Sequence, residues 1–245
     1  MTNSSFTMPA SNVTVSATFT NKHIPLTLKA LTEGTIVVDS PKSGMQYSKN
    51  GGAKTAMTET TTIDVAIGDT VSFYGSGTSI TSYKDTNING GTAEVKVYGN
   101  IMSLVDEEGF ATATSLADFA FYGLFQRKLS QGNSKLKDAS ELLLPADTLA
   151  PSCYRYMFYR CTSLTAAPAL PATTLAEYCY ASMFYGCTSL KAVTCLATDV
   201  SATECTNGWL YNVAANGTFT TPSSTNWSLD DVSGIPEGWT RVDAN

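Results

Sequence analysis

Histidine and charged residues are scarce in this sequence. His23 is the only histidine among 245 residues, and it precedes a stretch that reads as β structure. Ser-His-Asp and Cys-His catalysis needs an imidazole beside the nucleophile, and His23 would have to reach across domains to serve as one. We therefore expect an exposed histidine in a linker, and a protein that is not an enzyme.

The charge balance argues against polyanionic partners. Charged residues make up 15% of the chain, and the formal net charge is −6, with a pI near 4.7. A chain without a basic patch is poorly suited to nucleic acid or to anionic lipid. We expect no nucleic-acid partner.

Long apolar runs are also missing. Stretches such as "ELLLPA" and "FAFYGLF" are much shorter than the roughly 20 residues that cross a bilayer, so we expect no membrane insertion by this segment. The start, "MTNSSFTMPASN", has neither a basic n-region nor an apolar h-region. The protein is then either cytosolic or exported by a signal that this sequence does not contain.

Metal and nucleotide motifs are equally sparse, so we expect no metal and no cofactor. The six cysteines form no C-x-x-C pair, and "GSGTSI" at 75–80 lacks the third glycine of a nucleotide fingerprint. Asp106, Glu107 and Glu108 are adjacent, as are Asp230 and Asp231. Because adjacent carboxylates do not face one another, we interpret both groups as parts of solvated loops.

Residues 23–99 are predicted to form an antiparallel β-sandwich of immunoglobulin-like type. Apolar and polar residues alternate in several short segments, each next to Gly, Asn or Asp turn signals, which predicts about six or seven strands. The alternating apolar positions are Ile63, Val65 and Ile67, then Val71 and Phe73, then Ala93, Val95 and Val97. Residues 1–22 are predicted to form one further strand or a bent pair, which either docks on the next domain or is the remnant of an upstream repeat module.

An internal repeat is the strongest signal in the remaining segment, 100–245. "LPADTLAPSCYRYMFYRCTSLTAAP" (144–168) matches "LPATTLAEYCYASMFYGCTSLKAVT" (170–194) at 16 of 25 positions, with an offset of 26 residues. A degenerate earlier copy places Leu136 where Leu164 stands, and a later copy loses the period in the tail. Large apolar residues spaced by three and four in "SLADFAFYGLFQRKL" also predict a helical segment near 114–128.

The length of the repeat falls within the range of leucine-rich repeats. Leu164-x-x-Ala167-x-Ala169 and Leu190-x-x-Val193-x-Cys195 fit the strand signature. "CYRYMFYRC" and "CYASMFYGC" would then be the helical or 3₁₀ return segments. The inward side chains expected there are Met157, Phe158, Met183 and Phe184.

The fold class predicted from these patterns is mixed α and β with two domains. An antiparallel β-sandwich is followed by a short right-handed leucine-rich-repeat solenoid, which ends in an irregular C-terminal cap.

The unit "LPATTLAEYCYASMFYGCTSL" resembles the BspA-like leucine-rich repeats of surface proteins of Bacteroidetes. The tail and the β region are similar to other parts of the same group, and "FTMPASNVTVSATF" looks like the last strand of an InlB-type repeat module. The resemblance implies an exported, non-enzymatic protein at the extracellular or outer-membrane surface, which binds a host protein or a glycan in adhesion. The alternative is a structural spacer of a longer surface protein, with no ligand of its own.

Two readings of the cysteines remain open. Adjacent coils bring equivalent positions close together, which would allow disulfides, and Cys195 and Cys205 are then the pair to expect. Cys161 and Cys187, however, occupy a place that points inward in other leucine-rich repeats, and free cysteine is among the most buried residue types. We favour buried free thiols.

Differences between the two repeat copies suggest where a ligand would bind. Tyrosines at equal places in both copies, Tyr154 with Tyr180 and Tyr159 with Tyr185, are expected to serve packing. Positions that change between copies are freer and are expected to be exposed. If the repeats carry a binding surface, we predict it at Arg155, Tyr156 and Tyr178; the alternative is that these are ordinary surface residues.

Overall fold

The computed structural model describes residues 21–75, 85–89, 91–126 and 133–244. Two short 3₁₀ helices are present among them, η1 (Asn21–His23) and η2 (Ile101–Leu104). The strands of the N-terminal part are β1 (Thr27–Ala30), β2 (Gly34–Asp39), β3 (Gln46–Lys49), β4 (Lys54–Ala56), β5 (Thr61–Val65), β6 (Thr70–Tyr74), β7 (Asn87–Asn89) and β8 (Val95–Asn100). The C-terminal part adds β9 (Leu136–Leu143), β10 (Ala192–Thr194), β11 (Gly217–Thr221) and β12 (Trp239–Asp243).

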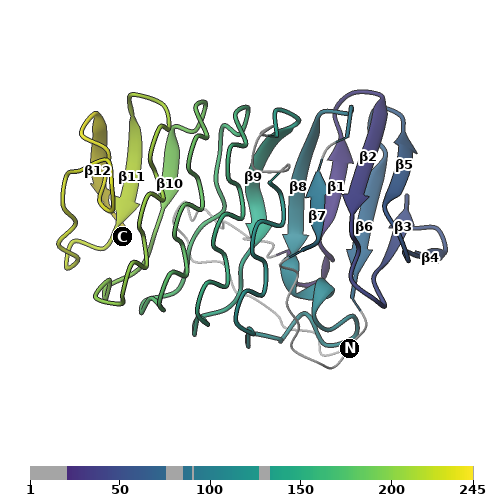
Figure 1. Ribbon diagram of the computed structural model, residues 1–245, viewed down its shortest axis with the longest axis horizontal. Helices are drawn as coiled ribbons and strands as arrows, with labels where there is room; N and C mark the ends of the chain where they lie inside the picture. The colour runs from purple at the N-terminus through teal and green to yellow at the C-terminus, as the bar shows by residue number, and fades with distance from the viewer. Residues whose placement is uncertain (1–20, 76–84, 90, 127–132, 245) are drawn as a thin grey trace, which may run out of the picture.

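The N-terminal strands form two sheets (Figure 1). One has the order β4-β3-β6-β1-β8-β9, and the other has the order β5-β2-β7. All pairings among β1 to β8 are antiparallel. Because side chains alternate along a strand, one set from each sheet is buried in the common core, among them Leu28, Ile36, Val71 and Phe73.

Most of the alternating residues expected to be inward are buried, and one is not. Ile63, Val65, Val71, Phe73, Ala93, Val95 and Val97 all lie in the core. Ile67 is 73% exposed, because β5 ends at Val65 and the chain turns toward β6. The strand expected within residues 1–22 lies almost wholly outside the described residues.

The six-stranded sheet runs across the predicted boundary between residues 99 and 100. Strand β8 pairs in parallel with β9, although the two strands are separated by a long stretch of chain. The buried Asn100 fixes the corner between them, since its side chain accepts a bond from the N–H of Met102 and donates to the carbonyl of Phe110. The first repeat unit is therefore attached to the sheet by backbone hydrogen bonds.

The predicted mixed α and β fold with a leucine-rich-repeat solenoid is wrong. The structure is 3% helical and 32% strand, and none of the helices among the described residues reaches seven residues. In place of the expected helix at 114–128, residues 118–125 form turns with positive φ at Phe119 and Gly123, and residues 114–117 have no regular structure. "CYRYMFYRC" and "CYASMFYGC" are turns as well.

Alternating amide groups explain why these segments do not become helices. In the unit that contains Tyr154, every second N–H bonds three residues back within the turn, as from Met157 to the carbonyl of Tyr154 at 3.1 Å. The intervening N–H groups bond to the next unit, as from Phe158 to the carbonyl of Met183 at 2.9 Å. An α-helix would direct every N–H to the carbonyl four residues back, and no group would be left for the neighbouring unit.

Positive values of the backbone torsion φ also recur at regular intervals along these segments. Positive φ appears at every fourth residue, and these positions are Ser152, Tyr156 and Arg160 in one unit, Tyr178, Ser182 and Gly186 in the next, and Glu204, Gly208 and Asn212 in the last. This left-handed conformation ends each turn before an α-helix can extend. Glycine and asparagine adopt it most easily, and they occupy three of these nine positions, Gly186, Gly208 and Asn212.

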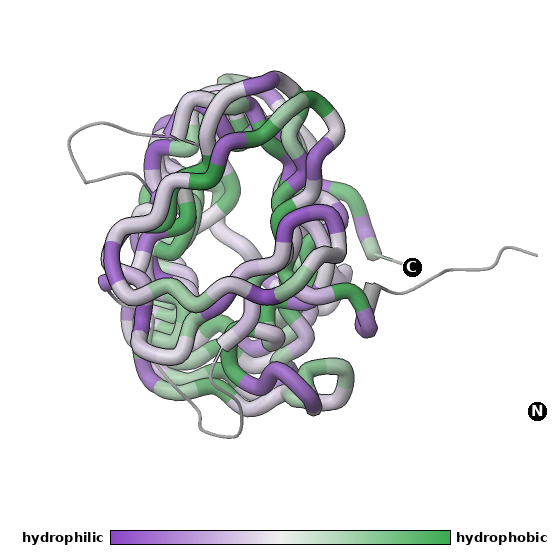
Figure 2. The backbone as a smooth tube through the Cα atoms, turned by 90° about the vertical axis from the view of Figure 1, so that its right-hand side faces the viewer, coloured by the Kyte–Doolittle hydropathy of each residue, from purple (hydrophilic) through white to green (hydrophobic). Residues whose placement is uncertain are grey.

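Inward side chains of successive units stack into columns of rings. Phe125, Phe158 and Phe184 form one column, with ring centres 5.2 and 5.5 Å apart. A second column consists of Phe121, Tyr154, Tyr180, Trp209 and Trp227. Seen along the long axis, the backbone traces of successive segments superpose on a common oval outline around this core (Figure 2). Met157 and Met183 are inward as predicted.

The register predicted for the repeats is confirmed. Thr165 donates its N–H to the carbonyl of Lys137, and Ala166 bridges Asp138, so Leu164 lies beside Leu136. In the strand signature, Val193 and Cys195 are buried, whereas Ala169 is exposed and Pro168 is buried in its place. The stack ends in a parallel sheet of order β10-β11-β12.

Phe158→Ala should destabilise the protein by about 3–5 kcal/mol, because it removes a fully buried ring between two stacked neighbours. Denaturant unfolding measures the loss. Tyr159→Ala is the matched control, since it truncates the adjacent, partly exposed aromatic residue and should cost clearly less. Equal losses of unfolding free energy in the two variants would contradict the conclusion that the ring of Phe158, and not that of Tyr159, belongs to the core.

Candidate ligand-binding surface

Partly exposed tyrosines form a row on the outer side of the turn segments. Phe158 faces inward, whereas the next residue, Tyr159, is partly exposed. We call Tyr122, Tyr156, Tyr159, Tyr185 and Tyr211 the outer tyrosine row. Successive ring centres along it are 5.3, 5.3, 5.0 and 5.0 Å apart.

The geometry of the row changes along its length. Tyr156 meets both Tyr122 and Tyr159 edge to face, whereas Tyr159, Tyr185 and Tyr211 stack with their planes 17° and 22° apart. Both arrangements are favourable for aromatic pairs. Burial raises the pKa of Tyr122, and the neighbouring Tyr156 adds to the rise, so Tyr122 remains a neutral phenol at physiological pH.

The structure brings the three predicted binding residues together. The guanidinium carbon of Arg155 lies 5.0 Å from the ring centre of Tyr156 and 4.9 Å from that of Tyr178. Its Nη2 also donates to the Tyr156 hydroxyl at 3.4 Å. A cation placed over aromatic faces is attracted by the ring quadrupole, so the rings hold this guanidinium in one place. Its Nε is buried without a hydrogen-bond partner.

Comparison of the two copies predicted exposure only in part. Tyr154 and Tyr180 are buried as expected, but Tyr159 and Tyr185 recur equally and are partly exposed. Of the changed positions, Ser152 and Ala181 are buried. Recurrence therefore marks both the inner and the outer columns, because each unit must stack with its neighbour on both sides of the turns.

All six cysteines are free and buried, as favoured from the sequence. Cys161 donates its S–H to the carbonyl of Phe125, and Cys187 does the same to Phe158. Each thiol thus bonds the equivalent carbonyl of the preceding unit. Cys195 and Cys205, the pair expected if a disulfide existed, are also free.

The other singled-out polar residues have structural surroundings. His23 is exposed in η1. Asp106 accepts bonds from the N–H groups of Glu108 and Gly109, and Glu107 forms an ion pair with Lys54. Within the described part of the chain, no group of three His, Cys, Asp or Glu side chains is placed to hold a metal ion. None of the helices described there has the length and hydropathy to cross a membrane.

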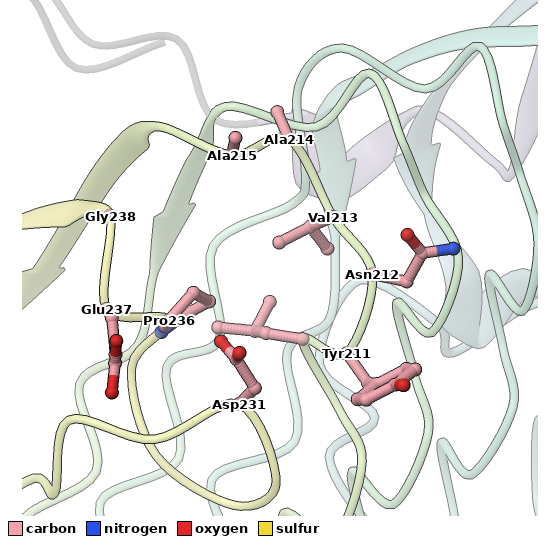
Figure 3. Close-up of a pocket in the computed structure, with 10 residues that line it drawn as sticks. Tyr211, Asn212, Val213, Ala214, Ala215, Asp231, Pro236, Glu237 and Gly238 are labelled. Atoms are coloured by element: carbon pink, nitrogen blue, oxygen red, sulfur yellow. The ribbon is translucent and has the colours of Figure 1, made fainter.

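A pocket of about 590 Å³ lies at the C-terminal end of the outer tyrosine row (Figure 3). Tyr211 forms part of its wall, and Asp231 and Glu237 contribute carboxylates. The remaining lining residues are Leu210, Asn212, Val213, Ala214, Ala215, Pro236 and Gly238. No sequence pattern predicted this pocket, because residues 210–215 and 231–238 belong to the tail in which the repeat period is lost.

The turn beside the pocket is fixed by Asp230. Its carboxylate accepts hydrogen bonds from the hydroxyl of Ser228 and from the N–H groups of Val232, Ser233 and Gly234. These bonds lower the pKa of Asp230 to about 2, with the Ser228 hydroxyl as the largest cause. Asp230 was interpreted as part of a solvated loop, and the structure gives it the role of shaping that loop.

No protein-family model, no curated protein and no solved structure matches this chain.

Thiol labelling should depend on unfolding. Burial raises the pKa of Cys153 and of Cys195 to about 12, and it raises that of the other four thiols as well. Since the thiolate is the reactive form, a maleimide at pH 8 should label none of the six in the native protein. In guanidinium chloride without reductant it should label all six, as counted by mass spectrometry. A smaller number would mean that a disulfide exists.

Stability should fall in acid. The folded-state pKa of both Asp69 and Asp230 is about 2, below the usual value near 3.8. A lowered folded pKa stabilises the native state above the unfolded value, and this contribution is lost as the pH falls from about 4 through about 2. Chemical denaturation across this range should show a smaller decrease for Asp230→Asn than for the parent chain. Asp231→Asn, which removes the same charge one residue away, is the matched control, and an unchanged slope in Asp230→Asn would refute the assignment.

Proposed function

We propose that the protein is a non-enzymatic binding protein of a bacterial cell surface, which attaches to a host protein or a glycan. The observation that carries the proposal is the cluster of Arg155, Tyr156 and Tyr178, which adjoins the outer tyrosine row through Tyr156. Tyrosine and arginine are the residues that contribute most often to binding energy at protein interfaces. Tyrosine also offers a flat apolar face together with a hydroxyl, which suits sugars as well as proteins.

The scaffold of this cluster supports a binding role. Tyr156 and Tyr178 belong to turns whose N–H groups bond to the next unit, at 3.1 Å to Ala181 and 3.0 Å to Thr203. Side chains that are ordered before binding lose less conformational entropy when a ligand arrives. Their positive φ is shared by other units, so it is part of the scaffold and not a strain specific to the site.

The proposed location at the extracellular or outer-membrane surface rests on the resemblance of the repeat to BspA-like surface proteins. The proposed partner is a protein or glycan at that surface. The ligand-free alternative, a spacer within a longer surface protein, predicts that the half-buried cluster can be changed without loss of any binding activity, and it is therefore an outcome of the same experiment.

Arg155→Ala, Tyr156→Ala and Tyr178→Ala combined in one chain should abolish capture on glycan arrays and on immobilised host extracellular-matrix proteins, with a loss of at least about tenfold in affinity. Lys29→Ala, on strand β1, is a control far from the cluster along the chain. Thermal unfolding should first establish that the triple variant is folded. Capture equal to the parent chain would overturn this placement, and absence of capture by the parent chain would favour the spacer.

A further inference from the structure

The outer tyrosine row ends at a ring with one uncovered face. Tyr185 stacks on one side of Tyr211 at 5.0 Å, and among the described residues no further ring stacks on the other side. Tyr211 is 45% exposed, and it lines the pocket of about 590 Å³. The row therefore ends on a free aromatic platform at a cavity whose volume is typical of small-molecule sites.

The series of backbone hydrogen bonds between successive units ends at the same place. Gly186 donates its N–H to the carbonyl of Tyr211, and Gly208 donates to that of Val232. The equivalent donors further along the last unit are the N–H groups of Leu210 and Asn212, and neither has a hydrogen bond within the described chain. Both residues line the pocket.

Acceptors and apolar surface complete the lining. Asp231 and Glu237 are exposed carboxylates, and Figure 3 shows the Asp231 carboxylate directed toward Pro236. Arginine, lysine and histidine are missing from the lining residues. An anionic ligand would meet like charge here, whereas hydroxyl or ammonium groups could donate to the carboxylates.

We propose that this end pocket binds one pyranose ring of a neutral or amino sugar, stacked on the free face of Tyr211. The ring's C–H face packs on the tyrosine, as a further aromatic residue would in a longer row. Its hydroxyl or ammonium groups donate to Asp231 and Glu237. Its hydroxyl oxygens accept from the N–H groups of Leu210 and Asn212. Because it names a ligand class, the inference rests on the proposed function, but it uses residues other than Arg155, Tyr156 and Tyr178.

The test titrates the full chain with methyl glycosides of glucose, galactose, mannose and N-acetylglucosamine, and with glucosamine and glucuronate, followed by NMR chemical-shift changes. At least one neutral or amino sugar should bind, and glucuronate should not. Tyr211→Ala and Asp231→Asn should each weaken binding by about tenfold or more, and Tyr211→Phe, which keeps the ring, should largely retain it. All three changes are at exposed residues, so these variants should fold.

The outcomes separate this inference from the proposed function. Sugar binding lost in the Arg155, Tyr156 and Tyr178 variant but kept in Tyr211→Ala would overturn the pocket assignment and leave the proposed function standing. Preference for glucuronate, or no binding by any sugar of the panel, would likewise overturn the pocket assignment. Loss of binding in Tyr211→Ala with retention in the triple variant would support it. A peptide that competes with the bound sugar at Tyr211 would show that the N–H groups of Leu210 and Asn212 bind an added β-strand instead. This result would overturn the assignment of a sugar ligand.

Discussion

Hydrogen bonds between neighbouring turn segments determine the arrangement of the C-terminal part. In each segment the amide groups alternate between a bond inside the turn and a bond to the next unit, as at Met157 and Phe158. The carbonyls of the next unit then fix the position of every second residue. Side chains that share a place in the repeat are held at nearly constant separations, which is why their rings meet at 5.0 to 6.5 Å in all of the stacked columns.

This constraint also accounts for the cysteines. Cys161 and Cys187 each close a run of turns and reach back to a phenylalanine carbonyl of the preceding unit. A small, weakly polar side chain suits a place that is fully buried and yet next to a backbone acceptor. A larger residue would separate the units and break the ladder, so the repeated cysteines have a packing role that needs no reactivity.

The sequence predicted the repeat and its inward residues but not the conformation of its return segment. Leu136, Leu164 and Leu190 share one register because identical side chains had to fill equivalent places. The helix prediction failed because turns with positive φ at every fourth residue bring side chains to one face with nearly the helical period of 3.6. Some of these positions carry glycine, such as Gly186 and Gly208, but most carry other residues, so residue type alone did not distinguish the two structures.

The candidate site was predictable to the extent that it depends on the two matching repeat copies. Arg155, Tyr156 and Tyr178 could be found because they differ between the copies, and the structure brings them into contact. The end pocket depends instead on where the last segment leaves the ladder after Gly208, and no local pattern encodes that departure. Tyr159 and Tyr185 were assigned to packing because recurrence does not distinguish an inward column from an outward one.

Each unit presents hydrogen-bond donors on one side and the matching acceptors on the other. The gain or loss of one whole unit by gene duplication or deletion would therefore leave both junctions intact. Such an event would lengthen or shorten the outer tyrosine row while the pocket beside Tyr211 kept its own walls. The length of the outer tyrosine row and the chemistry of the pocket beside Tyr211 could thus evolve separately within one chain.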